Sequence, residues 1–132
     1  VENSDLFAKY MARKADIRES RGPCEAPNPD IFTRDAIVSL PLSDMLSDLD
    51  DDVNEVYLWH GTSVRQGLMI AEADFDLALA GTGGGTMYGK GLYFTESVTK
   101  ADEYSRAEPD GFYEETRALL LCRVCLGKFH YT

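Results

Sequence analysis

Residues 59–104 constrain the fold and the function of this chain more than any other stretch. They begin with the sequence Trp-His-Gly-Thr at positions 59–62, directly after a short apolar segment. Glycines follow at positions 81, 83–85, 89 and 91, and residues 92–94 are Leu-Tyr-Phe. This order predicts one imidazole, one bare backbone position and two tyrosines around a slot for a flat ligand with a polar edge.

The composition predicts one soluble, acidic domain. The chain has 132 residues, of which 44% are hydrophobic, enough to bury a single core. It has neither a secretory pattern at its start nor the run of about 18 apolar residues that a membrane helix needs, so we expect an intracellular protein, nuclear or cytoplasmic, with no membrane contact. The formal charge of -10 disfavours nucleic acid as a partner, because nonspecific nucleic-acid binding depends on cationic side chains.

The cysteines predict neither a disulfide framework nor a metal site. Their number, three, is odd and fits a reducing compartment. Cys122 and Cys125 have the spacing of a zinc motif, but they lie in the apolar run 118–126, which is typical of a buried strand. Side chains three apart on a strand point to opposite faces, so we expect two core cysteines and no metal.

The acidic run at residues 44–55 resembles a calcium loop only in charge. It lacks the central glycine that such a loop requires at its sixth position, where this chain has Leu49. We therefore expect a solvated surface loop. Its acidic residues are Asp44, Asp48, Asp50, Asp51, Asp52 and Glu55.

The first half of the chain predicts one helix and then a breaker-rich connection. Residues 4–20 have helical spacing, with Asn3 or Ser4 as the cap. Prolines exclude regular structure over residues 21–29, and residues 35–40 form at most a short ordered piece. The apolar stripe expected to pack is Leu6, Phe7, Tyr10, Met11 and Ile17.

The second half predicts strands alternating with short helices. Residues 56–59 form a strand that ends at His60, and a short helix follows Thr62. Residues 92–94 form the next strand, with Tyr93 pointing away from its two apolar neighbours. A helix then begins near Ser97 or at Thr99, where residues 99–102 are a variant of the capping box, and a strand covers residues 119–126. On that helix Ala101 and Tyr104 share a face.

The glycine-rich loop has competing interpretations. Residues 84–90 match the first seven positions of a phosphate-binding loop, but Gly91 replaces the Ser or Thr of the eighth, and a strand is predicted where a helix is required. A dinucleotide-binding Gly-x-Gly-x-x-Gly and a hydrolase Gly-x-Ser-x-Gly are both absent from the sequence. A flexible turn without function stays open on composition alone.

Three pieces taken together, in this order and spacing, resemble the catalytic domain of the poly(ADP-ribose) polymerase family of diphtheria-toxin-like ADP-ribosyltransferases. They are His-Gly at residues 60–61, Tyr-Gly-x-Gly-x-Tyr-Phe at residues 88–94 and Lys-Ala-x-x-Tyr at residues 100–104. Residues 1–17, 58–62 and 121–128 are similar to that domain too. The resemblance implies an α+β ADP-ribosyltransferase fold, in which antiparallel or mixed sheets and flanking helices form an NAD cleft. We expect residues 1–132 to be one partial domain, incomplete at both ends, with an N-terminal helix at 1–20 and the NAD-binding core at 56–132.

The resemblance also implies a reaction and a site. Such enzymes use NAD as a co-substrate, without a metal, and transfer ADP-ribose to an acceptor, here expected to be a protein. His60 would bond a ribose hydroxyl, the backbone of Gly61 would bind the nicotinamide carboxamide, Tyr104 would stack on its ring, Tyr93 would close the pocket, and Thr62 would lie near the adenosine ribose. The implied catalytic residues are His60 and Tyr93, and the implied NAD-binding residues are His60, Gly61, Thr62, Tyr93, Phe94, Ala101 and Tyr104.

Two departures from the family pattern leave alternatives open. Family members often carry serine where this chain has Ala101, and the third signature residue is expected on a strand after Thr132. An active transferase, a catalytically inactive binding or interaction module that keeps the NAD pocket, and an unrelated strand-rich domain therefore all remain hypotheses.

Overall fold

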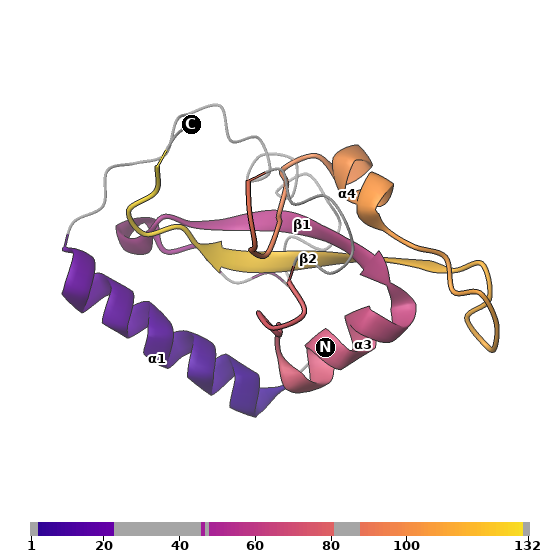
Figure 1. Ribbon diagram of the computed structural model, residues 1–132. Coiled ribbons are helices and arrows are strands. Elements are labelled where there is room, and N and C mark those ends of the chain that lie inside the picture. The colour runs from indigo at the N-terminus through magenta and orange to yellow at the C-terminus, as the bar shows by residue number, and fades with distance from the viewer. Residues whose placement is uncertain (1–2, 23–45, 47, 81–87, 131–132) are drawn as a thin grey trace.

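The computed structural model describes residues 3–22, 46, 48–80 and 88–130 (Figure 1). In this part of the chain, α helices and an antiparallel two-stranded sheet make an α+β arrangement, which is consistent with the fold class that the resemblance implies. The predictions for residues 35–40 and for most of the glycine-rich loop lie outside the described residues. The elements are α1 (Ser4–Arg21), the 3-10 helix η2 (Asp51–Val53), β1 (Glu55–Ser63), α3 (Val64–Ala73), α4 (Val98–Tyr104) and β2 (Arg117–Cys125).

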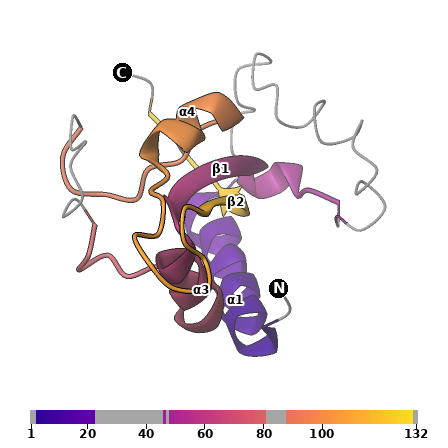
Figure 2. The same ribbon diagram turned by 90° about the vertical axis from the view of Figure 1, so that its right-hand side faces the viewer.

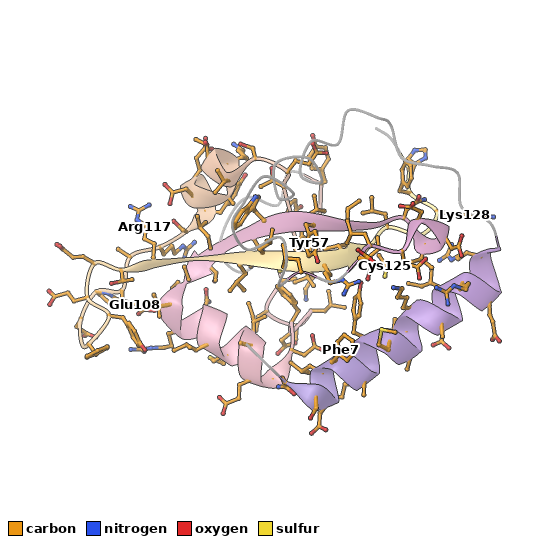
Figure 3. All side chains as sticks on the ribbon, turned by 180° about the vertical axis from the view of Figure 1, so that it is seen from behind. Phe7, Tyr57, Glu108, Arg117, Cys125 and Lys128 are labelled. Atoms are coloured by element: carbon orange, nitrogen blue, oxygen red, sulfur yellow. The ribbon has the colours of Figure 1, made fainter. Side chains whose placement is uncertain are left out.

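The sheet lies between two layers of helices. β1 and β2 pair in antiparallel register from Glu55 opposite Cys125 to Ser63 opposite Arg117. Helices α1 and α3 cover one face of the sheet and α4 covers the other, as the two views at right angles show (Figures 1 and 2). Figure 3 shows Arg117 and Glu108 at one end of β2, with Cys125 and Lys128 at the other. Because side chains alternate along a strand, neighbouring residues of β1 face different helices.

Helix α1 confirms the predicted span of residues 4–20, but part of its predicted packing stripe is wrong. Phe7 is 57% exposed and Met11 is 44% exposed, whereas the buried residue of the helix is Lys14. Consecutive helical residues lie about 100° apart around the axis. Leu6 and Tyr10 lie on the packing face, so the residues that follow each of them, Phe7 and Met11, point away from it. That face consists of Leu6, Tyr10, Lys14 and Ile17, of which Lys14 is buried and the others are half-buried.

A buried carboxylate explains why Lys14 faces inward. Glu55, at the start of β1, accepts hydrogen bonds from the Tyr10 hydroxyl at 2.5 Å, from Lys14 Nζ at 3.1 Å and from Arg123 Nη2 at 2.8 Å. Asp50 also pairs with Lys14, at 3.1 Å, and with Arg18. The prediction of a solvated acidic loop is therefore wrong for Glu55 and Asp50, which bind α1 to the sheet.

The α1 helix is also fastened at its other end. Asn3 is its N-cap, and its Oδ1 accepts from the backbone N–H of Leu6 at 3.1 Å, as the prediction of a cap at Asn3 or Ser4 allows. The same side chain donates from Nδ2 to the carbonyl oxygens of Ala71 and Glu72, at 3.2 and 3.1 Å. These carbonyls belong to the last turn of α3, so one side chain begins α1 and joins it to α3.

The strands and short helices correct several predicted boundaries. β1 continues to Ser63, so His60, Gly61 and Thr62 lie inside the strand and not beyond its end. The predicted strand at residues 92–94 is wrong, since the pairing there is a single bridge between Trp59 and Thr95. Ser97 caps α4, with its Oγ accepting from the N–H of Lys100 at 3.2 Å, so the alternative cap at Thr99 is also wrong. The helix after Thr62 and the strand at 119–126 are confirmed, as α3 and β2.

Candidate functional site

The backbone of Gly61 lies on an edge of β1 that β2 does not occupy. Trp59, two residues earlier, donates its N–H to Thr95 O at 2.7 Å and accepts from Thr95 N–H at 2.9 Å. Residues two apart on a strand direct their N–H and C=O groups to the same side, so Gly61 directs both groups to that edge. Continuing the register would pair Gly61 with Tyr93, but the bridge is isolated, and within the described residues Gly61 has no backbone partner there.

One face of Gly61 is covered by α4. A Cβ built on Gly61 would lie 1.8 Å from the carbonyl oxygen of Ala101 and 3.1 Å from the backbone nitrogen of Ser105. Ala101 is correspondingly buried, with 1% of its surface exposed. The space that a Cβ on Gly61 would need is therefore occupied by the backbone of α4. The strand and α4 therefore fix the position of the N–H and C=O of Gly61.

The imidazole of His60 is held by a carbonyl group and two aromatic rings. Its Nδ1 lies 2.9 Å from the backbone oxygen of Tyr93. Its ring centroid lies 5.2 Å from that of Phe75, with an interplanar angle of 86°, and 5.5 Å from that of Phe94. The ring is half-buried, so it remains accessible to a ligand. Phe75 is a residue of this site that sequence reasoning missed, because nothing in its local pattern distinguishes it from a residue of the core.

The Tyr93 side chain closes the turn that precedes it. Its hydroxyl donates to the carbonyl oxygen of Gly89 at 2.5 Å and accepts from the N–H of Tyr88 at 3.3 Å. Gly89 has φ +93°, a left-handed conformation that favours glycine. Tyr93 thus contributes its carbonyl to His60 and its hydroxyl to the turn, and its contact with a ligand stays a prediction.

The remaining candidate residues lie on both sides of the sheet. Tyr104 is 46% exposed at the end of α4, with Lys100 Nζ 5.5 Å from its ring centroid. Thr62 is buried on the opposite face, where its hydroxyl donates to Gln66 Oε1 at 3.0 Å. The structure therefore brings His60 together with Tyr93 and Phe94, and Gly61 together with Ala101. The roles of Tyr104 and Thr62 toward NAD stay predictions.

Comparison with known proteins decides the family. The family model for the poly(ADP-ribose) polymerase catalytic domain matches residues 28–132, well over half of the chain. The chain belongs to the poly(ADP-ribose) polymerase family. This membership excludes the hypothesis of an unrelated strand-rich domain. The helix α1 lies before the matched residues, so the likeness of that helix to the family domain stays a prediction.

Relatives within the poly(ADP-ribose) polymerase family include a protein named as a mono-ADP-ribosyltransferase and proteins named as poly(ADP-ribose) polymerases. Human protein mono-ADP-ribosyltransferase PARP12 is 35% identical over 77 residues, which are 58% of this chain and 10% of that protein. Poly(ADP-ribose) polymerase 1 of Danio rerio is 34% identical over 87 residues, 58% of this chain and 7% of that protein. Poly(ADP-ribose) polymerase 2 of Arabidopsis thaliana is 30% identical over 92 residues, 64% of this chain and 13% of that protein. The chain thus spans only about a tenth of the length of these relatives.

A separate cavity of about 230 Å³ lies between α1 and the sheet. It is lined by residues of α1 and β2 together with Phe75 and Phe94, whereas Gly61 and Ala101 are not part of its wall. Burial raises the pKa of the Cys122 thiol in this wall to about 11, so that thiol is protonated at neutral pH. The cavity and the edge at Gly61 are therefore two different places in this member of the family.

The described part of the chain contains neither a cluster of metal ligands nor a membrane-spanning helix. Across residues 3–22, 46, 48–80 and 88–130, no three His, Cys, Asp or Glu side chains are placed to hold one metal ion. No helix in this part of the chain is long and apolar enough to cross a membrane.

Proposed function

We propose that this chain forms part of an NAD-dependent ADP-ribosyltransferase that acts on a protein acceptor inside the cell. The enzyme breaks the bond between nicotinamide and ribose in NAD and transfers the ADP-ribosyl group. One observation carries the proposal: in a chain of the poly(ADP-ribose) polymerase family, Gly61 directs its N–H and its C=O to the same strand edge, where neither group has a backbone partner among the described residues.

The edge at Gly61 has the chemistry that a primary carboxamide requires. A carboxamide has one carbonyl acceptor and two N–H donors on one planar group, so it matches a backbone N–H and C=O that point the same way. Binding the carboxamide there fixes the nicotinamide ring in the plane of the strand edge. Tyr104, half exposed at the end of α4, then supplies an aromatic face for that ring.

Holding the ring accounts for much of the catalysis in this scheme. When the bond to ribose breaks, its electron pair goes to the pyridinium nitrogen, nicotinamide leaves neutral, and the ribose develops oxocarbenium character. Orientation lowers the barrier because the leaving group and the ribose no longer have to be aligned from free rotation. His60 contributes by binding a ribose hydroxyl, which keeps the sugar in place while the bond breaks.

The catalytically inactive module remains the second candidate, and Ala101 is the observation that favours it. A serine hydroxyl at this position would add a hydrogen bond to the carboxamide, worth about 0.5–1.5 kcal/mol. Its absence weakens nicotinamide binding without removing the backbone contacts of Gly61. A module of this kind would bind nicotinamide compounds and transfer no ADP-ribose.

A labelling experiment separates the two functions. Full-length protein is incubated with NAD carrying a label in its adenine part, and label on protein is measured for the wild type, His60→Ala and Tyr93→Ala. Phe112→Ala is the matched control, because it also removes a ring but one that is 94% exposed on the loop before β2. We expect at least about a tenfold loss in the first two variants, the equivalent of roughly 1.4 kcal/mol, and none in the control.

Two other outcomes would contradict the proposal, one by excluding the site residues and the other by excluding the transferase activity. Equal labelling of the wild type and all three variants would show that these residues are not the site. Saturable binding of 3-aminobenzamide with no labelling by the wild type would favour the inactive module.

A further inference from the structure

The imidazole of His60 occupies one corner of a triangle of rings. Phe75 meets it edge to face, Phe94 meets it at a tilt of 50°, and Phe75 and Phe94 contact each other at 5.4 Å between centroids. Edge-to-face contact sets the positive edge of one ring on the negative face of another, so it favours one orientation of both. The triangle therefore restricts rotation of the imidazole.

The Tyr93 carbonyl determines which imidazole nitrogen carries the proton. A carbonyl oxygen only accepts hydrogen bonds, so the 2.9 Å contact requires a hydrogen on Nδ1. In neutral imidazole the other nitrogen, Nε2, is then an acceptor. Among the described residues we find no partner for Nε2, which leaves it available to a ligand.

We propose that Phe75 is a positioning residue for His60: together with the Tyr93 carbonyl it holds the imidazole with hydrogen on Nδ1, so that Nε2 accepts a hydrogen bond from a ribose hydroxyl of NAD. This inference rests on the proposed function for the identity of the ligand. The tautomer and its dependence on Phe75 are properties of the protein alone. They can therefore be measured without NAD.

The chain bends at a conformationally strained residue to place Phe75. Asp74 ends α3 with φ 96° and ψ 168°, a region that residues with a Cβ rarely adopt. Its N–H donates to Ile70 O at 2.9 Å, and its Oδ1 accepts from the N–H of Phe75 at 2.7 Å. These bonds hold the strained turn that carries Phe75 from the end of α3 to His60.

The test is NMR spectroscopy of the two histidine side chains with 15N labelling, recorded at a mildly alkaline pH of about 8. His130 is exposed and serves as the reference for an unconstrained ring. We expect His60 to show one protonated Nδ1 and one unprotonated Nε2, and His130 to show averaged signals. In Phe75→Leu the His60 signals should move toward those of His130, whereas Phe75→Tyr, which keeps the ring, should restore the wild-type pattern.

A kinetic measurement connects the tautomer to the ligand. Phe75→Leu should raise the KM for NAD about 2- to 12-fold, the range that loss of one ring contact predicts, and Phe75→Tyr should reverse the change. Phe7→Leu, at an exposed phenylalanine of α1, is the control and should change neither KM nor the spectrum. If Phe75→Leu does not fold, Phe75→Met, whose unbranched and flexible side chain fills irregular gaps, takes its place.

The NMR spectra test the positioning of His60, and label transfer from NAD tests the proposed function, so the two can fail separately. A wild-type His60 with averaged signals or with hydrogen on Nε2 overturns the inference, as does an unchanged spectrum in Phe75→Leu. The predicted spectra without any label transfer from NAD would instead overturn the proposed function and leave the positioning of His60 intact.

Discussion

A Cβ at Gly61 of β1 would lie 1.8 Å from the carbonyl oxygen of Ala101 in α4. The contact is with backbone, so a larger residue cannot be accommodated by a change of rotamer. We predict that Gly61→Ala lowers the free energy of unfolding by about 1–3 kcal/mol, the usual cost of overpacking, and displaces α4 from the strand. Urea unfolding of the wild type and the variant measures the difference.

Gly67→Ala is the matched control for this substitution. A Cβ on Gly67, in α3, would contact Ala118, Leu120 and Thr62 at 3.4–3.6 Å, which is ordinary packing distance. Because alanine is favoured over glycine within a helix by about 1 kcal/mol, we expect this variant to be as stable as the wild type or slightly more stable. Equal loss of stability in both variants would contradict the account of Gly61.

The Glu55 carboxylate makes stability depend on pH in the acidic range. Burial alone would raise its pKa, but hydrogen bonds from Arg123, Tyr10, the backbone of Asp50 and Lys14 outweigh burial and lower the pKa from its usual 4.5 to about 2. The unfolded chain therefore binds a proton at Glu55 at higher pH than the folded chain does. The contribution is complete above pH 4.5 and is lost as the pH falls toward 2, by about 1.4 kcal/mol per pH unit. Unfolding curves measured between these limits test the sign and the range.

Glu55→Gln should remove most of this pH dependence and destabilise the fold. It leaves Lys14 and Arg123 with less negative charge to pair with, and breaking a buried ion pair costs about 3–5 kcal/mol. Glu19→Gln, at an exposed position of α1, is the control and should change the free energy of unfolding by no more than about 0.5 kcal/mol. A Glu55→Gln protein with wild-type stability at neutral pH would show that α1 is not bound through this carboxylate.

Local patterns predicted the elements of this fold better than the contacts between them. The helical spacing of residues 4–20 correctly predicted α1, and the apolar run at 119–126 correctly predicted β2. The boundaries of both elements differ from the predicted ones by one or two residues. Glu55 was assigned to a solvated loop, because its partners Lys14 and Arg123 are 41 and 68 residues away in the sequence and no local pattern connects them. Burial of a charge is decided by such partners and not by its neighbours along the chain.

The geometry of the candidate site could not be predicted from the sequence. The alternation of residues 92–94 suggested a strand, yet Tyr93 directs its carbonyl to a side chain, His60, and the ladder stops at the bridge between Trp59 and Thr95. Phe75 was not predicted, since its position depends on the strained turn at Asp74. The contact of the Tyr93 carbonyl with His60 and the placement of Phe75 depend on tertiary structure, which overrides local propensity.

Restoring a hydroxyl at position 101 should strengthen nicotinamide binding. Ala101→Ser adds one donor and acceptor on the residue that lies against Gly61, and we expect 3-aminobenzamide to bind about 2- to 12-fold more tightly, as one added hydrogen bond predicts. Ala12→Ser, on the exposed side of α1, controls for the helical cost of serine. Isothermal titration calorimetry measures the affinity of each variant for 3-aminobenzamide. Weaker binding by Ala101→Ser would show that this residue does not face the carboxamide.

The most direct test of the account is whether the backbone N–H of Gly61 binds a carboxamide. Nicotinamide is titrated into 15N-labelled protein, and the backbone amide signals of Gly61 and Gly67 are followed. We predict a saturable downfield shift of the Gly61 proton, as expected for a new hydrogen bond at the free strand edge, with no change at Gly67 in α3. Saturable binding that moves other amides and leaves Gly61 unchanged would contradict the central claim.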